Sequence, residues 1–180
     1  MHSYFCGMPE NLHFSNSSDS DIPELVKLVN SAYRGETSKK GWTTEADLLD
    51  GIRTDEDGIY KMLHQPGSVI LKCMVGNKLA GCVYLQKQAD FLYLGMLTVS
   101  PELQASGIGK ELLKVSEEYA RKEGCHSIKM TVITVRNELI RWYERRGYFQ
   151  TEERQPFPND SRFGIPRQPL EFLVMEKKLR

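Results

Sequence analysis

Apolar residues recur along this chain with two periods, one typical of helices and one typical of strands. Between residues 22 and 33, apolar side chains at positions 22, 25, 28, 29 and 32 follow the spacing of a helix that buries one face. Asp21, Pro23 and Glu24 are the capping residue, the early-turn proline and the capping-box acid that such a helix start favours. The pattern predicts a first helix here, and residues 12 to 15 predict a short strand before it.

The middle of the chain has the pattern of strands. Residues 68 to 75 and 79 to 86 are rich in β-branched and apolar side chains. Gly76 and Asn77 lie between them and are typical turn residues, so the two segments are expected to form an antiparallel hairpin. Residues 91 to 99 are apolar on both alternating faces, which predicts a central strand covered on each side.

Helix and strand then alternate. Residues 110 to 122 continue an apolar repeat at intervals of three and four, which predicts a helix. Residues 127 to 135 predict another strand, and residues 137 to 146 a second amphipathic helix. Asn137 has the chemistry of an N-cap and Gly147 that of a helix stop, so this last helix is expected to be short.

Three further segments complete the pattern. Residues 44 to 49 predict a short helix that ends at Gly51. Four of the eight prolines fall between residues 151 and 169, which predicts a surface loop. The apolar stretch after it predicts a closing strand over residues 170 to 179, and its first half, residues 170 to 175, could pair across a homodimer.

This order of elements predicts a single α/β domain. A chain of 180 residues fits one domain with a substantial core. The expected architecture is a mixed central sheet of six to seven strands with helices on both faces. Residues 1 to 11 are expected to be a loose tail, and residues 12 to 180 the domain.

Composition excludes several classes of protein. The 24 Lys and Arg balance the 24 Asp and Glu, so no overall field favours nucleic acid or an anionic membrane surface. No stretch approaches the roughly 20 apolar residues of a membrane span, and the first twenty residues lack the apolar run of a signal peptide. The four cysteines form no C-x-x-C pair and have no histidine at zinc-ligand spacing, so we expect reduced thiols, no metal, and a soluble cytoplasmic protein.

A glycine-rich segment follows the central strand and opens the next helix. A helix start offers unpaired backbone N–H groups and the positive end of a dipole, and Gly107 and Gly109 remove side chains where a phosphate would approach. The alternative is that both glycines only permit a tight turn. Known nucleotide loops do not fit: a Walker A loop needs other residues at Gln104 and Glu111, and the dinucleotide fingerprint needs a small residue at Leu112.

The pattern Q-x-x-G-x-G after an apolar strand resembles the coenzyme A loop of the Gcn5-related N-acetyltransferase (GNAT) superfamily. Residues 135 to 148, V-R-N-E-L-I-R-W-Y-E-R-R-G-Y, are similar to its second signature, an Asn that starts a short helix, a Tyr six residues on, and a G-Y close. The likeness covers about residues 12 to 179 and is nearly silent about the acceptor. It implies splayed central strands and acetyl-CoA as cosubstrate.

The resemblance also implies roles for individual residues. The central strand would pair with the pantetheine arm, and the loop amides would cradle the pyrophosphate. Asn137 would contact the coenzyme arm, and Tyr143 would lie beside the sulfur as proton donor to the thiolate, although Tyr143 could also be a packing residue. The implied coenzyme residues are Leu97, Thr98, Val99, Gln104, Ala105, Ser106, Gly107, Ile108, Gly109, Lys110, Asn137 and Tyr143.

The general base is left open by the sequence. Tyr93 stands where some superfamily members carry a glutamate. Glu45 is the candidate base because its region usually lines the acceptor side, but it could equally be a first-turn acid that stabilises a helix start. A water chain could also suffice. The proline-rich stretch around Phe157 and Pro158 could form a lid.

The resemblance implies an enzyme that moves an acetyl group from acetyl-CoA to a primary amine by direct attack. Near-zero net charge gives no sign of a groove for basic peptides, so a small-molecule amine is the expected acceptor. A protein lysine or N-terminus is the alternative acceptor. A non-catalytic acyl-CoA sensor is the alternative from another class, and the presence of both Asn137 and Tyr143 argues against it.

Overall fold

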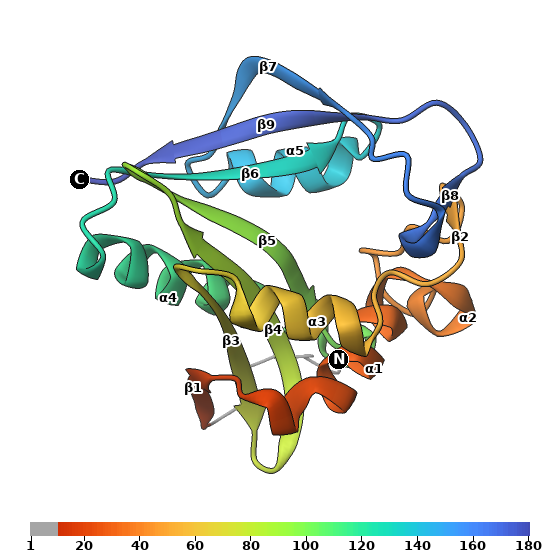
Figure 1. Cartoon of the computed structure of the whole chain (residues 1–180), viewed down its shortest axis with the longest axis horizontal. Coiled ribbons are helices and arrows are strands. Elements are labelled where there is room, and N and C mark those ends of the chain that lie inside the picture. The colour runs from red at the N-terminus through yellow and green to blue at the C-terminus, as the bar shows by residue number, and fades with distance from the viewer. Residues whose placement is uncertain (1–10) are drawn as a thin grey trace, which may run out of the picture.

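The computed structural model describes residues 11 to 180, so the tail predicted over residues 1 to 11 lies, except for Asn11, outside the described residues. Seven strands form one sheet in the order β1-β3-β4-β5-β6-β9-β7 (Figure 1). Among the strands of the described residues only β5 and β6 pair in parallel, so the sheet is mixed, as predicted. The strands are β1 (Leu12–Asn16), β3 (Ser68–Val75), β4 (Lys78–Lys87), β5 (Phe91–Val99), β6 (Ser127–Ile133), β7 (Phe149–Pro156) and β9 (Glu171–Lys178). A separate pair joins β2 (Leu49–Asp50) to β8 (Ile165–Pro166).

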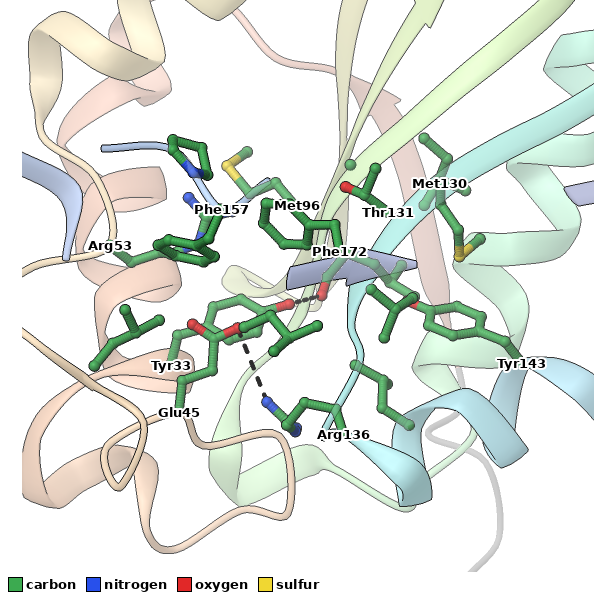
Figure 2. A pocket seen from close by; sticks show the side chains of 18 of the residues that line it. Tyr33, Glu45, Arg53, Met96, Met130, Thr131, Arg136, Tyr143, Phe157 and Phe172 are labelled. Atoms are coloured by element: carbon green, nitrogen blue, oxygen red, sulfur yellow. Dashed lines mark hydrogen bonds and ion pairs between the residues drawn. The ribbon is translucent and has the colours of Figure 1, made fainter. Parts of the chain in front are cut away.

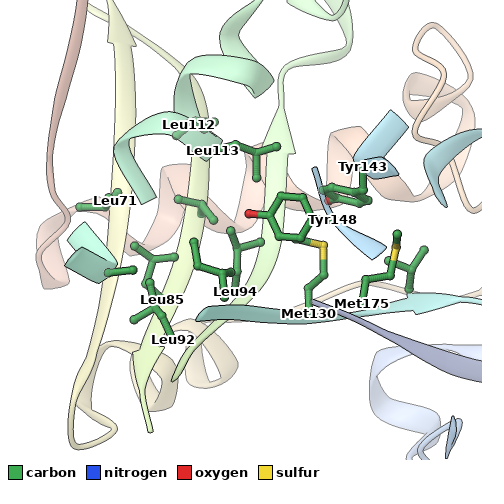
Figure 3. Packing of buried hydrophobic residues seen from close by; sticks show 14 of the residues in the cluster. Leu71, Leu85, Leu92, Leu94, Leu112, Leu113, Met130, Tyr143, Tyr148 and Met175 are labelled. Carbon is green, nitrogen blue, oxygen red and sulfur yellow. The ribbon is translucent and has the colours of Figure 1, made fainter. Parts of the chain in front are cut away.

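Helices cover both faces of the sheet, as predicted. Helices α1 (Ile22–Tyr33) and α3 (Glu56–His64) pack with one face of β3 to β5 in a cluster that includes Leu25 and Ile59. On the other face, α4 (Ile108–Lys122) and α5 (Asn137–Glu144) contribute to a larger cluster, in which Leu112 and Tyr143 are buried (Figure 3). The short helix α2 is Gly35–Ser38, and single 3-10 turns are Asp19–Asp21, Pro101–Leu103 and Ser161–Phe163.

The two central strands separate after three residue pairs. β5 pairs with β6 only from Phe91 to Tyr93, and beyond this point the strands diverge (Figure 1). On its other side β5 carries a bulge, because Met96 and Leu97 together oppose the single residue Val83 of β4. Met96 has a positive φ of 52°, which is uncommon for a residue other than glycine and marks the bend. The splay implied by the resemblance is therefore present.

The helix predicted over residues 44 to 49 is wrong. These residues form turns that lead into β2, and helices α2 and α3 lie on either side. The Thr44 hydroxyl hydrogen-bonds to the Ser38 hydroxyl at 2.6 Å, an interaction with the preceding helix rather than with a helix of its own. Helix α3 was missed although Asp55 caps it, with its carboxylate accepting from Gly58 N at 2.7 Å.

The loop predicted over residues 151 to 169 is also wrong in its first half. Residues there belong to β7, an edge strand that pairs with β9 and is displaced by an irregularity between Gln150 and Arg154. β9 consequently lies between β6 and β7, so the stretch from residue 170 to 175 is not a free edge and cannot pair across a dimer in the predicted way.

Two helix starts differ in detail from expectation. The Asp21 carboxylate accepts from Ser18 N at 2.8 Å and so closes the 3-10 turn that precedes α1, rather than capping α1 itself. Asn137 is the first residue of α5, and Arg136 takes the N-cap position. Both helices nevertheless begin within a residue of the predicted start.

Candidate active site

The glycine loop has the backbone that close approach of an anion requires. Gly107 caps α4 with a φ of 90°, and Ala105 has a φ of 65°, so the chain turns sharply just before the helix. The first amides of α4 have no partner within the helix. A Cβ added at Gly109 would lie 3.3 Å from the Trp142 ring, so this position admits nothing larger without displacing that ring. These features favour an anion at the start of α4.

A cavity of about 330 Å³ lies beside this loop. Lys110 and Arg146 line it and bring positive charge to the start of α4. The Arg146 guanidinium carbon lies 3.7 Å from the centre of the Trp142 ring, and its Nη1 donates to the Trp142 carbonyl at 2.7 Å. Sequence reasoning missed Arg146, which lies in the turn after α5, four residues after Trp142.

Gln104 connects the loop to the segment that follows α2. Its Nε2 donates to the Thr43 hydroxyl at 2.8 Å and to the Val99 carbonyl at 3.1 Å. Its Oε1 accepts from the Trp42 main-chain N–H at 2.8 Å. A Cβ at Gly41 would lie 2.4 Å from this oxygen, so the segment can pass close to Gln104 only because residue 41 is glycine. Gln104 therefore positions the loop with its side chain.

A second cavity of about 390 Å³ lies where β5 and β6 diverge. It shares four lining residues with the first cavity, so the two meet at the gap between the strands. Figure 2 shows Tyr33 and Tyr143 entering this second cavity from α1 and α5. The shared residues are Tyr33, Leu97, Leu139 and Tyr143.

Tyr143 is buried at the junction of the two cavities. The residue is 6 % exposed, and its hydroxyl makes no hydrogen bond to any residue between 11 and 180. Burial raises the pKa of Tyr143 well above its usual range, and the nearby Tyr33 and Tyr148 add to this effect. The hydroxyl therefore keeps its proton at neutral pH and lies where both cavities can reach it.

Tyr33 contacts the central strand at its bulge. Its hydroxyl donates to the Leu97 carbonyl (Figure 2). Burial raises the pKa of Tyr33 to about 12, and the negative charge of Glu45 contributes. Sequence reasoning did not identify Tyr33, because nothing in the pattern of α1 separates it from a packing residue.

Glu45 lies in the second cavity and is 12 % exposed. One carboxylate oxygen accepts from Arg34 Nη1, and the other lies 3.9 Å from Arg136 Nη1 (Figure 2). Because residue 45 is in no helix, its interpretation as a first-turn acid is wrong. Both oxygens already face guanidinium groups, and a role for Glu45 as the base stays a prediction.

The other predicted coenzyme residues divide into two groups. Besides Tyr143, those that line the first cavity are Leu97, Val99, Gln104, Ala105, Gly107, Gly109 and Lys110. Four do not line it with any atom: Thr98 and Ile108 are buried in the core, Ser106 lies on the loop, and Asn137 is exposed at the start of α5. Contact of any of the predicted residues with a coenzyme stays a prediction.

Comparison with known proteins gives the family. A model of the acetyltransferase (GNAT) family matches residues 23–148, which include the glycine loop, the splayed strands and Tyr143. The chain belongs to this family. As a GNAT protein it is an enzyme, an acetyl-CoA-dependent N-acetyltransferase.

Curated relatives are distant members of the same family. Acetyltransferase Atu2258 of Agrobacterium fabrum is 26% identical over 138 residues, which are 77% of this chain and 83% of the relative. The uncharacterized N-acetyltransferase MJ1207 of Methanocaldococcus jannaschii is 24% identical over 148 residues. That match covers 76% of this chain but only 60% of the relative's length.

Solved structures share the fold. The ribosomal-protein-S18-alanine N-acetyltransferase of Escherichia coli superposes with a TM-score of 0.70 at 15% identity, over 94% of each chain. YncA of Salmonella typhimurium, a putative acetyltransferase solved with its cofactor acetyl-CoA, superposes with a TM-score of 0.66 at 18% identity, also over 94% of each chain. At these identities the likeness establishes the architecture alone.

The described part of the chain lacks a metal cluster and a membrane-spanning helix. Between residues 11 and 180, no group of three His, Cys, Asp or Glu side chains is placed to hold a metal ion. In the same range, no helix combines the length and apolar character needed to cross a bilayer. The cysteines in this range, Cys73, Cys82 and Cys125, are free and buried.

Proposed function

We propose that this GNAT enzyme transfers the acetyl group of acetyl-CoA to the primary amine of a small molecule by direct attack of the amine. The first cavity would hold the coenzyme and the second the acceptor. The observation that carries this assignment is the shared boundary of the two cavities at the gap between β5 and β6, because only there can a thioester and an amine meet.

The first cavity suits the coenzyme. Leu97 and Val99 line it on the stretch of β5 that no longer pairs with β6, so a pantetheine arm would run along this stretch. Their carbonyls already accept from the Tyr33 hydroxyl and from Gln104 Nε2, so any further main-chain pairing would use their N–H groups. The start of α4, with Lys110 and Arg146 beside it, suits the pyrophosphate. The glycine at position 109 leaves room for it next to the Trp142 ring.

The coenzyme supplies an activated acyl carbon and a thiol leaving group. Main-chain N–H groups at the β5 bulge are the proposed donors to the acyl oxygen. Tyr33 holds the carbonyl of Leu97 and so supports the geometry of this bulge. Tyr143 holds a proton at its hydroxyl and is the proposed acid for the departing sulfur.

The size of the second cavity supports a small acceptor. A volume of about 390 Å³ lies at the lower end of the range for small-molecule sites. Phe157 and Pro158, from the segment after β7, line it, and a role for this segment as a lid stays a prediction. At residue 167 this segment is attached to β2, because Arg167 donates to the Asp50 carboxylate from both Nε and Nη2, the shorter of these two bonds being 2.6 Å.

Coenzyme thiol release tests the proposal. The purified protein would be incubated with acetyl-CoA and, separately, with free primary amines and with peptides that carry lysine or a free N-terminus. We expect thiol release with at least one class of free amine. Faster release with peptides would support a protein acceptor, and binding of acetyl-CoA without release in any arm would support a sensor.

A further inference from the structure

Charge in the acceptor cavity is unevenly distributed. The chain as a whole is neutral, yet three arginines and two carboxylates line this cavity. Asp160, one of the carboxylates, is already bonded by Arg162 at 2.7 Å. Glu45, the other, faces Arg34 and Arg136. The cavity therefore has an excess of positive charge.

Arg53 is the arginine of this cavity that pairs with neither carboxylate. It follows β2 and makes no ion pair with any residue of the described range 11 to 180. Its main chain is fixed, because Arg53 N donates to the Asn30 side-chain oxygen at 2.7 Å. Its guanidinium lies 5.9 Å from the centre of the Tyr33 ring and lines the cavity while only half-buried.

The positions of Arg53 and Tyr143 indicate how an acceptor would lie. In Figure 2 the two side chains are at opposite ends of the cavity, and Phe157, Phe172 and Met96 lie between them. A bound amine must react at the Tyr143 end, where the two cavities meet. The Arg53 guanidinium then lies at the far end. The middle of the cavity has an apolar wall that includes the rings of Phe157 and Phe172, whose centroids are 5.1 Å apart.

We propose that the acceptor carries an anionic group, a carboxylate or a phosphonate-like oxyanion, which Arg53 holds while an apolar body spans the cavity to the reacting amine. This inference rests on the proposed function and narrows its substrate class. A guanidinium suits such planar or tetrahedral oxyanions, since it offers parallel N–H donors. Polyamines and other polycations are disfavoured, because a second positive charge would meet Arg53 without a counter-ion.

Amines with one aromatic body and different charges test the inference. The set is para-(aminomethyl)benzoate, its benzylphosphonate analogue, neutral-bodied para-methylbenzylamine and the diamine para-xylylenediamine, all of which place the variable group opposite the reacting amine. We expect kcat/KM to be at least about tenfold higher for an anionic member than for its neutral match, mainly through KM. The carboxylate and phosphonate arms distinguish the two oxyanions.

Arg53→Gln should remove this preference, with the KM for the anionic amine rising about tenfold, and Arg53→Lys should retain part of it. Arg121→Gln is the matched control, because Arg121 lies at the distal end of α4 and lines neither cavity. Thermal melting would show that each variant folds. A preference that survives Arg53→Gln, or neutral and dicationic amines that react as well as the anionic ones, would overturn the inference.

Binding gives a readout that does not depend on turnover. The same amines would be titrated by calorimetry into protein saturated with coenzyme A, and the anionic members should bind about tenfold more tightly. Equal affinities would overturn the inference even if some amine is acetylated. Absence of acetyl-CoA binding would instead refute the proposed function. If acidic peptides reacted faster than any free amine, the anionic acceptor would be a protein, and the small-molecule class would be refuted.

Discussion

Replacing Tyr143 by phenylalanine removes one oxygen atom from the junction of the two cavities and leaves the ring in place. The ring packs edge-on against Trp142 and Tyr148, with centroids 5.0 and 5.7 Å away, and these contacts are retained in the variant. The hydroxyl makes no hydrogen bond to any residue in the described range, so its removal leaves no buried partner unsatisfied. The free energy of unfolding should therefore change by less than about 1 kcal/mol.

Turnover should change far more. Loss of a positioned proton donor typically costs about 10² to 10⁴ in rate. A thiolate is a fair leaving group and water can replace part of the donor's role, so we expect a loss of at least about tenfold, equivalent to about 1.4 kcal/mol of activation free energy. Affinity for acetyl-CoA should stay near the wild-type value, because the ring that lines the first cavity is retained.

Tyr148→Phe is the matched control for Tyr143→Phe. Tyr148 is also buried, its hydroxyl also lacks a partner in the described structure, and its ring touches Tyr143, but it lines neither cavity (Figure 3). The assay is thiol release under saturating amine, with single-turnover measurements to show that chemistry limits the rate. If Tyr143→Phe binds coenzyme normally and turns over at the wild-type rate, or if Tyr148→Phe is equally impaired, Tyr143 is a packing residue.

Four other results are expected. Acetyl-CoA should bind with a dissociation constant in the micromolar range or better, about 8 kcal/mol, and calorimetry without heat at millimolar coenzyme would contradict this. Gly109→Glu should abolish that binding in a folded protein, because a carboxylate would take the phosphate's place; unchanged affinity would reduce the loop to a turn. Glu45→Gln should lower turnover if Glu45 is the base. Unchanged turnover with about 2 kcal/mol less stability would make Glu45 only the counter-ion of Arg34 and Arg136. Tyr33→Phe should reduce the loss of stability above pH 10. Burial raises the pKa of Tyr33 from about 10 in the unfolded state to about 12 in the folded state, so above pH 10 the wild type loses about 1.4 kcal/mol of unfolding free energy per pH unit through this group. Denaturant unfolding of both proteins at pH 8 to 11 would measure the difference.

Local patterns predicted the elements whose stability is local. The first helix and the hairpin of β3 and β4 were correct, because their apolar repeats and turn residues act over a few positions. The helix prediction for residues 44 to 49 failed because side chains of this segment bond to the Ser38 hydroxyl and the Arg34 guanidinium, and both partners lie outside the segment. Strand β7 failed because it is an exposed edge rich in charge, so main-chain pairing with β9 rather than apolar alternation defines it.

The candidate site divides in the same way. The glycine loop could be predicted because a strand, a turn and a helix start follow one another in the chain. The acceptor cavity could not, since Tyr33, Arg53 and Arg136 come from three distant segments that only the fold brings together. The bulge at Met96 could not be predicted either, because its position depends on the register of β5 against β4.

Acetyl transfer to a free amine at the junction of the two cavities would leave two products that can be measured together. Its most direct test is to incubate the wild type with acetyl-CoA and the amine panel and to quantify, in the same reactions, free coenzyme thiol and the N-acetylated amine by mass spectrometry. We expect equal amounts of thiol and acetylated amine, with both rates reduced at least about tenfold in Tyr143→Phe. Thiol release without acetylated amine, or equal yields that Tyr143→Phe does not reduce, would contradict it.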